Sequence, residues 1–189
     1  VVALVAACVI GLVRDPVQAP LLVLGMLLVG SALGWAVAMR VNMIQIPAMV
    51  AFQHGAGGVA AFLIAFVELS RTTITLDATG KVSGLLSLVV GAATFAGSLL
   101  AAGKLANKMS GRPTLLRAHN AILVGIVAVL VLMSVAAVGP DYAPAPWLVA
   151  MILLSIVLGV VFAMRIGGAD MPVLISFLNA TAGLAAALC

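Results

Sequence analysis

The sequence has 189 residues, of which 65% are hydrophobic and 7% are charged, and its formal net charge is +4. Soluble domains carry roughly a quarter charged residues, so this composition excludes an ordinary water-soluble enzyme. Uncharged apolar stretches of about 20 residues, the length of a helix that crosses a bilayer, lie between small clusters of charge. They do not alternate apolar and polar residues as the strands of a membrane barrel do. The sequence therefore predicts an all-α, polytopic membrane protein.

Seven apolar segments follow one another along the chain, so we expect a transmembrane bundle of about seven helices. Polar or proline-containing breaks separate the segments. Because the chain begins and ends inside apolar runs, at Val1 and Cys189, we interpret it as a fragment of a longer subunit that forms one transmembrane domain over residues 1–189. The segments are Val1–Val13, Leu21–Met39, Ala48–Val67, Val82–Gly103, Ala121–Val138, Trp147–Met164 and Val173–Leu188.

The basic residues indicate how the segments are oriented. If consecutive segments cross the membrane in turn, six basic residues fall on one side and three on the other. Cytoplasmic loops are enriched in Lys and Arg, so the first side, called the basic side below, is predicted to be cytoplasmic. It carries Arg40, Lys104, Lys108, Arg112, Arg117 and Arg165, and the opposite side carries Arg14, Arg71 and Lys81. The enrichment of cytoplasmic loops in Lys and Arg explains the basic stretch 103–119. The alternative is that this stretch is a docking surface for an anionic partner domain or for acidic lipid headgroups.

The sequence contains an internal repeat at an offset of 125 residues. In each copy an apolar segment is followed by Arg, a short loop, Pro and a second apolar segment. Four segments, an even number, separate the copies, so both insert in the same orientation and the repeat is parallel. The segments Ala48–Val67 and Val173–Leu188 are therefore expected to be structural counterparts. The matches are Leu33, Gly34, Ala38, Met39, Arg40, Pro47, Phe52, Gly58, Ala60 and Ala61 with Leu158, Gly159, Ala163, Met164, Arg165, Pro172, Phe177, Gly183, Ala185 and Ala186.

The counterpart segments carry His54 and Asn179 at matching positions, each seven residues after its proline. At 1.5 Å per residue, both side chains are expected roughly 10 Å into the membrane. A polar group is costly there unless it is paired or hydrated, so an ionisable residue is a functional candidate. Histidine exchanges protons near neutral pH, and Asn can orient an imidazole or hold a water molecule. The alternative is that both side chains only hydrogen-bond neighbouring helices.

Other polar or small residues leave two interpretations open. The stripe of small residues on the segment Val82–Gly103 favours close helix packing over a hydrated path, in which Ser98 would be the most useful hydroxyl. The stripe consists of Ser83, Ser87, Gly91, Thr94, Ser98 and Ala102. Asp170, two residues before Pro172, is either a helix N-cap or a proton-entry group.

Two other patterns are interpreted as structural. The glycines at 55, 57 and 58 match a dinucleotide-binding fingerprint, but no strand precedes them, and close helix contact or local unwinding explains them better. Cys8 and Cys189 are interpreted as small apolar side chains because no His or acidic cluster accompanies them. No metal site is expected.

Three motifs resemble the membrane part of the β subunit of proton-translocating NAD(P) transhydrogenase, and they span nearly the whole chain from about Leu21 onward. They are Ile46-Pro47-Ala48-Met49-Val50-Ala51-Phe52-Gln53-His54, Phe95-Ala96-Gly97-Ser98 running into Gly103-Lys104-Leu105, and Gly167-Gly168-Ala169-Asp170-Met171-Pro172 leading to Asn179. The last of them is the most specific.

The resemblance implies a function and a role for each site residue. In that family, hydride passes from NADH to NADP⁺ between two soluble domains, and the membrane domain couples this transfer to inward proton movement. By resemblance, His54 is the proton-relay histidine and Asn179 its polar partner. Ser98 is then a channel-side residue, and Asp170 is the loop acid that faces the NADP(H)-binding domain. No cofactor is expected on this chain, since NAD(H) and NADP(H) bind partner domains.

The resemblance also implies a larger assembly in the inner membrane of a bacterial cell, with this chain as a multi-pass component. The expected partners are α-subunit membrane helices, the NAD(H)- and NADP(H)-binding soluble domains, a second copy of the whole enzyme and the lipid bilayer, without nucleic acid. From the residues alone, the alternative is a stand-alone proton-coupled secondary transporter or channel, because repeats and an intramembrane histidine occur in such proteins too.

Overall fold

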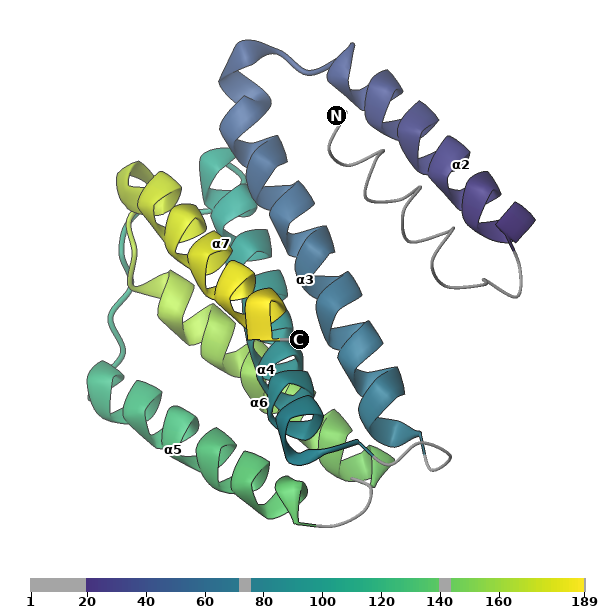
Figure 1. Ribbon diagram of the computed structural model, residues 1–189. Helices are drawn as coiled ribbons and strands as arrows, with labels where there is room; N and C mark the ends of the chain where they lie inside the picture. Colours follow the sequence, from purple (N-terminus) through teal and green to yellow (C-terminus); the bar gives the residue numbers. More distant parts are fainter. Residues whose placement is uncertain (1–19, 72–75, 140–143, 189) are drawn as a thin grey trace. The chain divides into compact units, whose positions relative to one another are not determined.

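The apolar stretches form helices in the computed structural model, which describes residues 20–71, 76–139 and 144–188. Within these residues every regular element is helical, so the all-α prediction is confirmed there. The predicted segment Val1–Val13 lies outside the described residues, and the other six predicted segments each correspond to an α-helix. The elements are α2 (Pro20–Ala38), η1 (Met43–Gln45), α3 (Ile46–Ser70), α4 (Ala78–Leu105), α5 (His119–Val138), α6 (Ala145–Met164), η2 (Gly168–Asp170) and α7 (Met171–Leu188) (Figure 1).

Four stretches of the described chain are long and apolar enough to cross a membrane. They are Met43–Ser70, Ala78–Leu105, His119–Val138 and Ala145–Met164, while the apolar part of α2, Val23–Ala38, is shorter. The prediction of about seven helices is thus approximate.

The helices begin one to four residues earlier than the apolar segments predicted. Hydropathy marks where apolar side chains start, whereas a helix begins at the residue that caps it. The Asp77 side chain accepts a hydrogen bond of 2.8 Å from the amide of Gly80 and so caps α4. Pro47 and Pro146 stand in the first turns of α3 and α6, where a missing N–H costs nothing.

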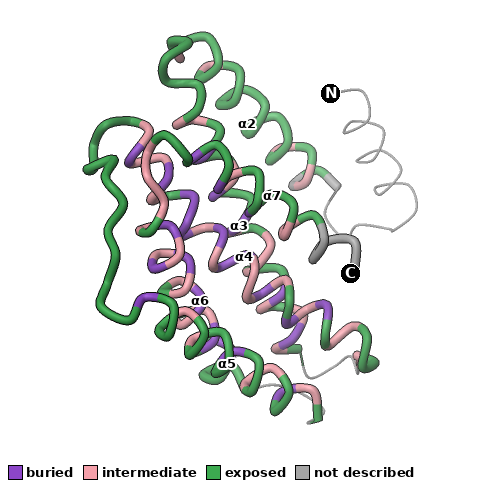
Figure 2. The backbone as a smooth tube through the Cα atoms, turned by 90° about the vertical axis from the view of Figure 1, so that its left-hand side faces the viewer, coloured by how far each residue is buried: buried purple, intermediate pink, exposed green. Residues whose placement is uncertain are grey.

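The chain divides into two units, Val1–Met43 and Ile44–Cys189, which are described separately. The first contributes α2, and the prediction of a single transmembrane domain over residues 1–189 stays a prediction. In the second unit α4 packs against α3, α5, α6 and α7 and is the central helix. Figure 2 shows the buried residues gathered on α4 and on the faces turned toward it, whereas much of α5 is exposed.

Glycines bring three helices of the second unit into close contact. A Cβ on Gly58 of α3 would lie 2.7 Å from the carbonyl oxygen of Gly91 on α4, so the two backbones touch. On another face of α4, a Cβ on Gly97 would lie 3.5 Å from the carbonyl oxygen of Gly159 on α6. Small residues allow such close approach between membrane helices. The interpretation as helix contacts is therefore confirmed for Gly55 and Gly58, whereas a Cβ on Gly57 would meet no atom within 4 Å, and α3 continues through all three without unwinding.

Most basic residues of the second unit lie at the end of α4, in the loop that follows it or just after α6. Buried Lys104, 6% exposed, donates hydrogen bonds to the carbonyls of Ala163, Met164 and Ile166 at 3.1, 3.2 and 2.7 Å. The amide of Gly168 donates to the carbonyl of Gly111 at 2.8 Å, which joins the loops after α4 and α6. At the opposite end, the Lys81 ammonium donates to the carbonyl of Val138. The grouping of Lys104 and Arg165 on one side is confirmed, and its assignment to the cytoplasm stays a prediction.

The internal repeat recurs in the secondary structure. The 3-10 helix η1 begins at Met43 and η2 at Gly168, and the helices that follow begin at Ile46 and Met171, both at the offset of 125. Figure 1 shows that α3 and α7 run in the same direction, as a parallel repeat requires. The expectation that α3 and α7 are counterparts is confirmed at this level.

Candidate functional site

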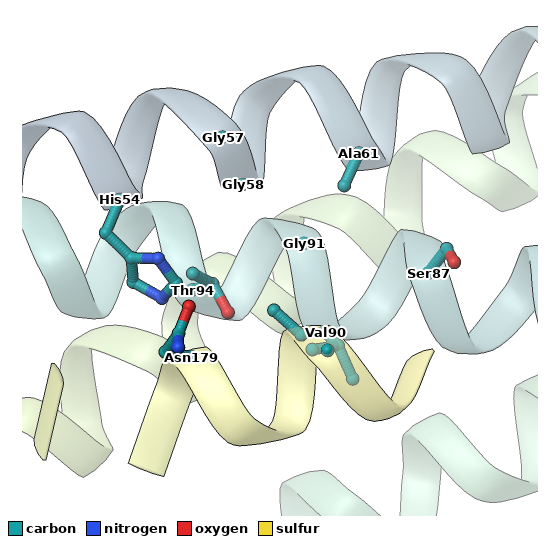
Figure 3. A pocket seen from close by; sticks show the side chains of 11 residues that line it. His54, Gly57, Gly58, Ala61, Ser87, Val90, Gly91, Thr94 and Asn179 are labelled. Atoms are coloured by element: carbon teal, nitrogen blue, oxygen red, sulfur yellow. The ribbon is translucent and has the colours of Figure 1, made fainter. Parts of the chain in front are cut away.

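A cavity of about 350 Å³ lies between α3, α4 and α7. In Figure 3, α3 and α7 form its two walls and α4 lies behind them as its floor. Its lining is mostly small or apolar, and His54 is the one ionisable side chain among the described residues that line it. The lining residues are His54, Gly57, Gly58, Ala61, Ser87, Val90, Gly91, Thr94, Asn179, Ala182 and Gly183.

The two walls are equivalent faces of the repeat. His54 and Asn179 are separated by the offset of 125, and so are two further lining pairs, Gly57 with Ala182 and Gly58 with Gly183. The cavity therefore lies between matching surfaces of the counterpart helices. This arrangement brings together the two polar residues that occupy matching positions in the repeat.

His54 is half-buried and turned toward the cavity (Figure 3). Its imidazole lies next to the backbone of Leu178, the residue before Asn179. Its Nε2 atom is buried and has no hydrogen-bond partner within the described part of the chain. The Asn179 side chain points from α7 toward the same space. A water molecule has polar partners here, because the imidazole and the amide can each donate and accept.

Of the two hydroxyl residues that line the cavity, Ser87 and Thr94, Thr94 lies nearer to His54, and its position in the small-residue stripe did not distinguish it from the other members. It is 1% exposed, and its side chain lies beside the His54 ring and Asn179 (Figure 3). Hydroxyls in apolar helices commonly bond to a carbonyl of the preceding turn, as those of Ser134 and Ser155 do here at 2.8 and 2.7 Å. The Thr94 hydroxyl has no such partner among the residues described. It is therefore available to a group in the cavity.

Ser98 and Asp170, the other two predicted site residues, lie outside the cavity lining. Ser98 is fully buried and lies one turn beyond Thr94. A Cβ added to Gly55 would lie 3.4 Å from the Cβ of Ser98. Asp170 lines a separate cavity of about 450 Å³ together with Arg165 and Gly167. It precedes Asn179 by nine residues, or roughly 13 Å along a helix.

The small-residue stripe of α4 takes part in helix packing and also in the cavity lining, and the hydrated path stays a prediction. Ser87, Gly91 and Thr94 line the cavity, and Gly91 also touches α3. Ser83 and Ser98 are buried, 6% and 0% exposed, and do not line the cavity. No group of three or more His, Cys, Asp or Glu side chains that could hold a metal ion occurs in the described ranges. The ionisable lining residue, His54, carries an imidazole, a group that exchanges protons near neutral pH.

Comparison with known proteins agrees with the resemblance in the three motifs. A family described as NAD(P) transhydrogenase beta subunit matches residues 1–189. Two curated relatives, both named NAD(P) transhydrogenase subunit beta and both from Rhodospirillum rubrum, are each 36% identical to the chain over 183 residues. The alignments cover 93% of this chain but 39% of each relative, so the chain spans about two fifths of their length. The chain belongs to the NAD(P) transhydrogenase beta subunit family.

Proposed function

We propose that this chain is the proton-translocating membrane domain of an NAD(P) transhydrogenase, which couples hydride transfer from NADH to NADP⁺ on soluble domains to proton movement across the membrane. The observation that carries the proposal is the cavity in which His54, the ionisable lining residue, lies with Asn179 and Thr94 among apolar helices. Family membership favours this function over a stand-alone transporter or channel.

In this mechanism His54 binds one proton at a time. A proton passes from water in the cavity to the imidazole, which becomes an imidazolium and later releases the proton on the other side of the membrane. The Leu178 backbone and the Asn179 side chain hold the ring, and the Thr94 hydroxyl donates to or accepts from the water. A movement that changes the surroundings of the ring changes its proton affinity, because nearby charges, hydrogen bonds and burial set that affinity.

Coupling to the soluble domains runs through the basic side. Asp170 ends η2 and Asn179 lies on the helix that follows, so a displacement at Asp170 moves Asn179 with it. We assign Asp170 to contact with the NADP(H)-binding domain. Ser98 packs beside Gly55, next to His54, and we assign it to holding α3 against α4 along the proton path. Nucleotide exchange in the docked domain then biases two arrangements of α7.

The proposed assembly contains α-subunit membrane helices, the two nucleotide-binding domains and a second copy of the enzyme in the inner membrane of a bacterium. The subunit name of the relatives supports further subunits. The surface of α5 supports contact with lipid or other membrane helices, because Val124, Leu132 and Val135 are 69%, 68% and 68% exposed. We propose that residues 1–189 form one transmembrane domain of this assembly.

Replacement of the His54 imidazole in the complete enzyme tests the proposal. In proteoliposomes, His54→Gln should abolish hydride-driven proton uptake, measured with a pH-sensitive dye, and should leave NADP(H) binding unchanged. His119→Gln is the matched control, because His119 lies at the start of α5, outside the cavity lining. Proton uptake by His54→Gln at the rate of the unmodified enzyme would refute the proposal.

A further inference from the structure

An apolar groove of about 390 Å³ lies between α4 and α5 and shares no lining residue with the His54 cavity. Its floor contains Leu85 of α4 and Leu130 of α5, which are 2% and 3% exposed. Its rims contain Leu86 of α4 and Val131 of α5, which are 39% and 54% exposed. The groove therefore opens on the outer surface of these helices.

The lining of the groove suits hydrocarbon and offers nothing to water. All of its lining residues are Val or Leu except Ser134. The Ser134 hydroxyl donates a hydrogen bond of 2.8 Å to the carbonyl of Leu130 in its own helix. Apolar cavities of this kind stay dry and bind apolar ligands.

The groove has the length of one leaflet of a bilayer. Val138 follows Val127 by eleven residues, and these two residues mark the extent of the lining along α5, or roughly 16 Å of helix. A bilayer core is about 30 Å thick, so the groove covers about half of it. Because Val138 is the last residue of α5, this is the half that lies away from the basic side.

The volume of the groove favours a single chain over a helix. A helix is about 10 Å across and would fill roughly 1,200 Å³ over the same length, about three times the volume of the groove. A lipid acyl chain is thinner than a helix and extends along the bilayer normal. One acyl chain is therefore the occupant that fits the dimensions.

A cation lies at the outer end of the groove. Lys81 precedes the lining residue Val82, and its ammonium donates a hydrogen bond of 3.2 Å to the carbonyl of Val138. The carboxylate of Asp77, one turn earlier, accepts from the amide of Gly80 at 2.8 Å. The start of α4 and the end of α5 meet here, at the level of the lipid headgroups. Lipid phosphates are attracted to a lysine in this position.

We propose that the groove holds one acyl chain of a phospholipid from the leaflet opposite the basic side, with the phosphate against the Lys81 ammonium. The Val and Leu lining binds the chain, the length of the groove selects the leaflet, and Lys81 binds the phosphate. The bound chain fills the space between α4 and α5. This site acts independently of proton binding at His54.

Photocrosslinking of the complete enzyme in proteoliposomes tests the site. The probe is a phosphatidylglycerol with a diazirine near the end of one acyl chain, present as a minor component of phosphatidylcholine vesicles. Mass spectrometry of the digested enzyme locates the adducts after irradiation. Adducts are expected on Leu130, because only a chain inside the groove reaches this buried side chain.

A variant that fills the groove should abolish this adduct. Val131→Trp places an indole at the rim, where it competes with the chain for the same space. Val124→Trp is the matched control, because Val124 lies two turns earlier on α5, is 69% exposed and does not line the groove. The control should keep the labelling of Leu130.

A second probe tests the role of the phosphate. A photoreactive diacylglycerol with the same acyl chains lacks the phosphate and should label Leu130 about fivefold less, the ratio that attraction by one lysine at a membrane surface gives. Lys81→Gln should remove the difference between the two probes. Arg71→Gln, which removes a charge at the same end of the helices, should retain it.

Two results would overturn the proposal. Absence of adducts on Leu130 in the unmodified enzyme, with Val124 labelled, would show that protein covers the groove or that no lipid enters it. Equal labelling of Leu130 by the two probes, or equal effects of Lys81→Gln and Arg71→Gln, would exclude a phosphate bound at Lys81.

Discussion

The Lys104 ammonium on α4 donates a hydrogen bond of 2.7 Å to the carbonyl of Ile166, two residues beyond the end of α6. Two more carbonyls at that end, those of Ala163 and Met164, accept from the same ammonium. The carboxyl end of a helix carries partial negative charge and unpaired carbonyls, so a cation there is stabilised. Lys104 thus joins α4 to the segment from which η2 and α7 begin.

Replacement of Lys104 by Met should destabilise the protein. Met has a similar length but leaves the three carbonyls without their donor, and a hydrogen bond to a charged group contributes about 1.5–3 kcal/mol. The thermal midpoint of the purified complete enzyme should fall, measured by circular dichroism. Lys108→Met, an exposed position in the following loop, is the control and should have little effect. Equal midpoints for the two variants would contradict the assigned role of Lys104.

Replacement of Gly58 by Ala should weaken the contact between α3 and α4. The added Cβ would lie 2.7 Å from the Gly91 oxygen and 2.8 Å from the Phe95 nitrogen, both backbone atoms that cannot rotate away. Overpacking of this kind costs typically about 1–3 kcal/mol. Gly57→Ala has no atom within 4 Å of its new Cβ and, as a helix-favouring change, should raise stability slightly. Thermal unfolding of the two variants separates the effect of the helix contact from the effect of helix propensity. A thermal midpoint of Gly58→Ala equal to or above that of the unmodified protein would contradict the close contact between α3 and α4.

Removal of the Thr94 hydroxyl should slow proton translocation. Thr94→Val keeps the volume of the side chain but removes the donor and acceptor beside His54, and about 1.4 kcal/mol of lost stabilisation corresponds to a tenfold slower step. Thr94→Ser keeps the hydroxyl and should retain most of the rate. Ser134→Ala, which removes a hydroxyl bonded to Leu130 on α5, is the control. Equal rates for Thr94→Val and Thr94→Ser, measured as proton uptake by proteoliposomes, would exclude the hydroxyl from the path.

Exchange of His54 and Asn179 should preserve part of the function. The two positions are equivalent in the repeat and line one cavity, so an imidazole at position 179 would enter the same space from the other wall. His54→Asn alone should abolish proton uptake, and the double variant His54→Asn with Asn179→His should restore a measurable part of it. If the double variant is as inactive as the single one, the two walls are not functionally equivalent.

The sequence predicted the parts of the structure that depend on local pattern. Hydropathy located six of the described helices, because each long apolar stretch must satisfy its own backbone hydrogen bonds in a bilayer. The repeat offset identified α3 and α7 as counterparts and so selected His54 and Asn179 together. Their meeting in one cavity follows from that equivalence.

The remaining features depend on how helices cross, which the sequence pattern does not specify. Thr94 and Ser98 belong to one stripe in which the residues have the same spacing whether they pack against a helix or line the cavity. The place where α4 crosses α3, at Gly91, determines that Thr94 lines the cavity and Ser98 does not. Lys104 was attributed to the charge bias of cytoplasmic loops. Its burial depends on the position of the last turn of α6, where the carbonyl of Ala163 lies 59 residues farther along the chain.

The contact between Gly58 and Gly91 also determines which helix can adjust the space around the imidazole. With no side chain between them, the backbones of α3 and α4 cannot approach further, and these two helices form a fixed frame. The third helix, α7, meets α4 through the Leu178 side chain, which can change rotamer. We therefore expect tilting or sliding of α7 to set the width of the cavity beside His54, while α3 and α4 stay in place.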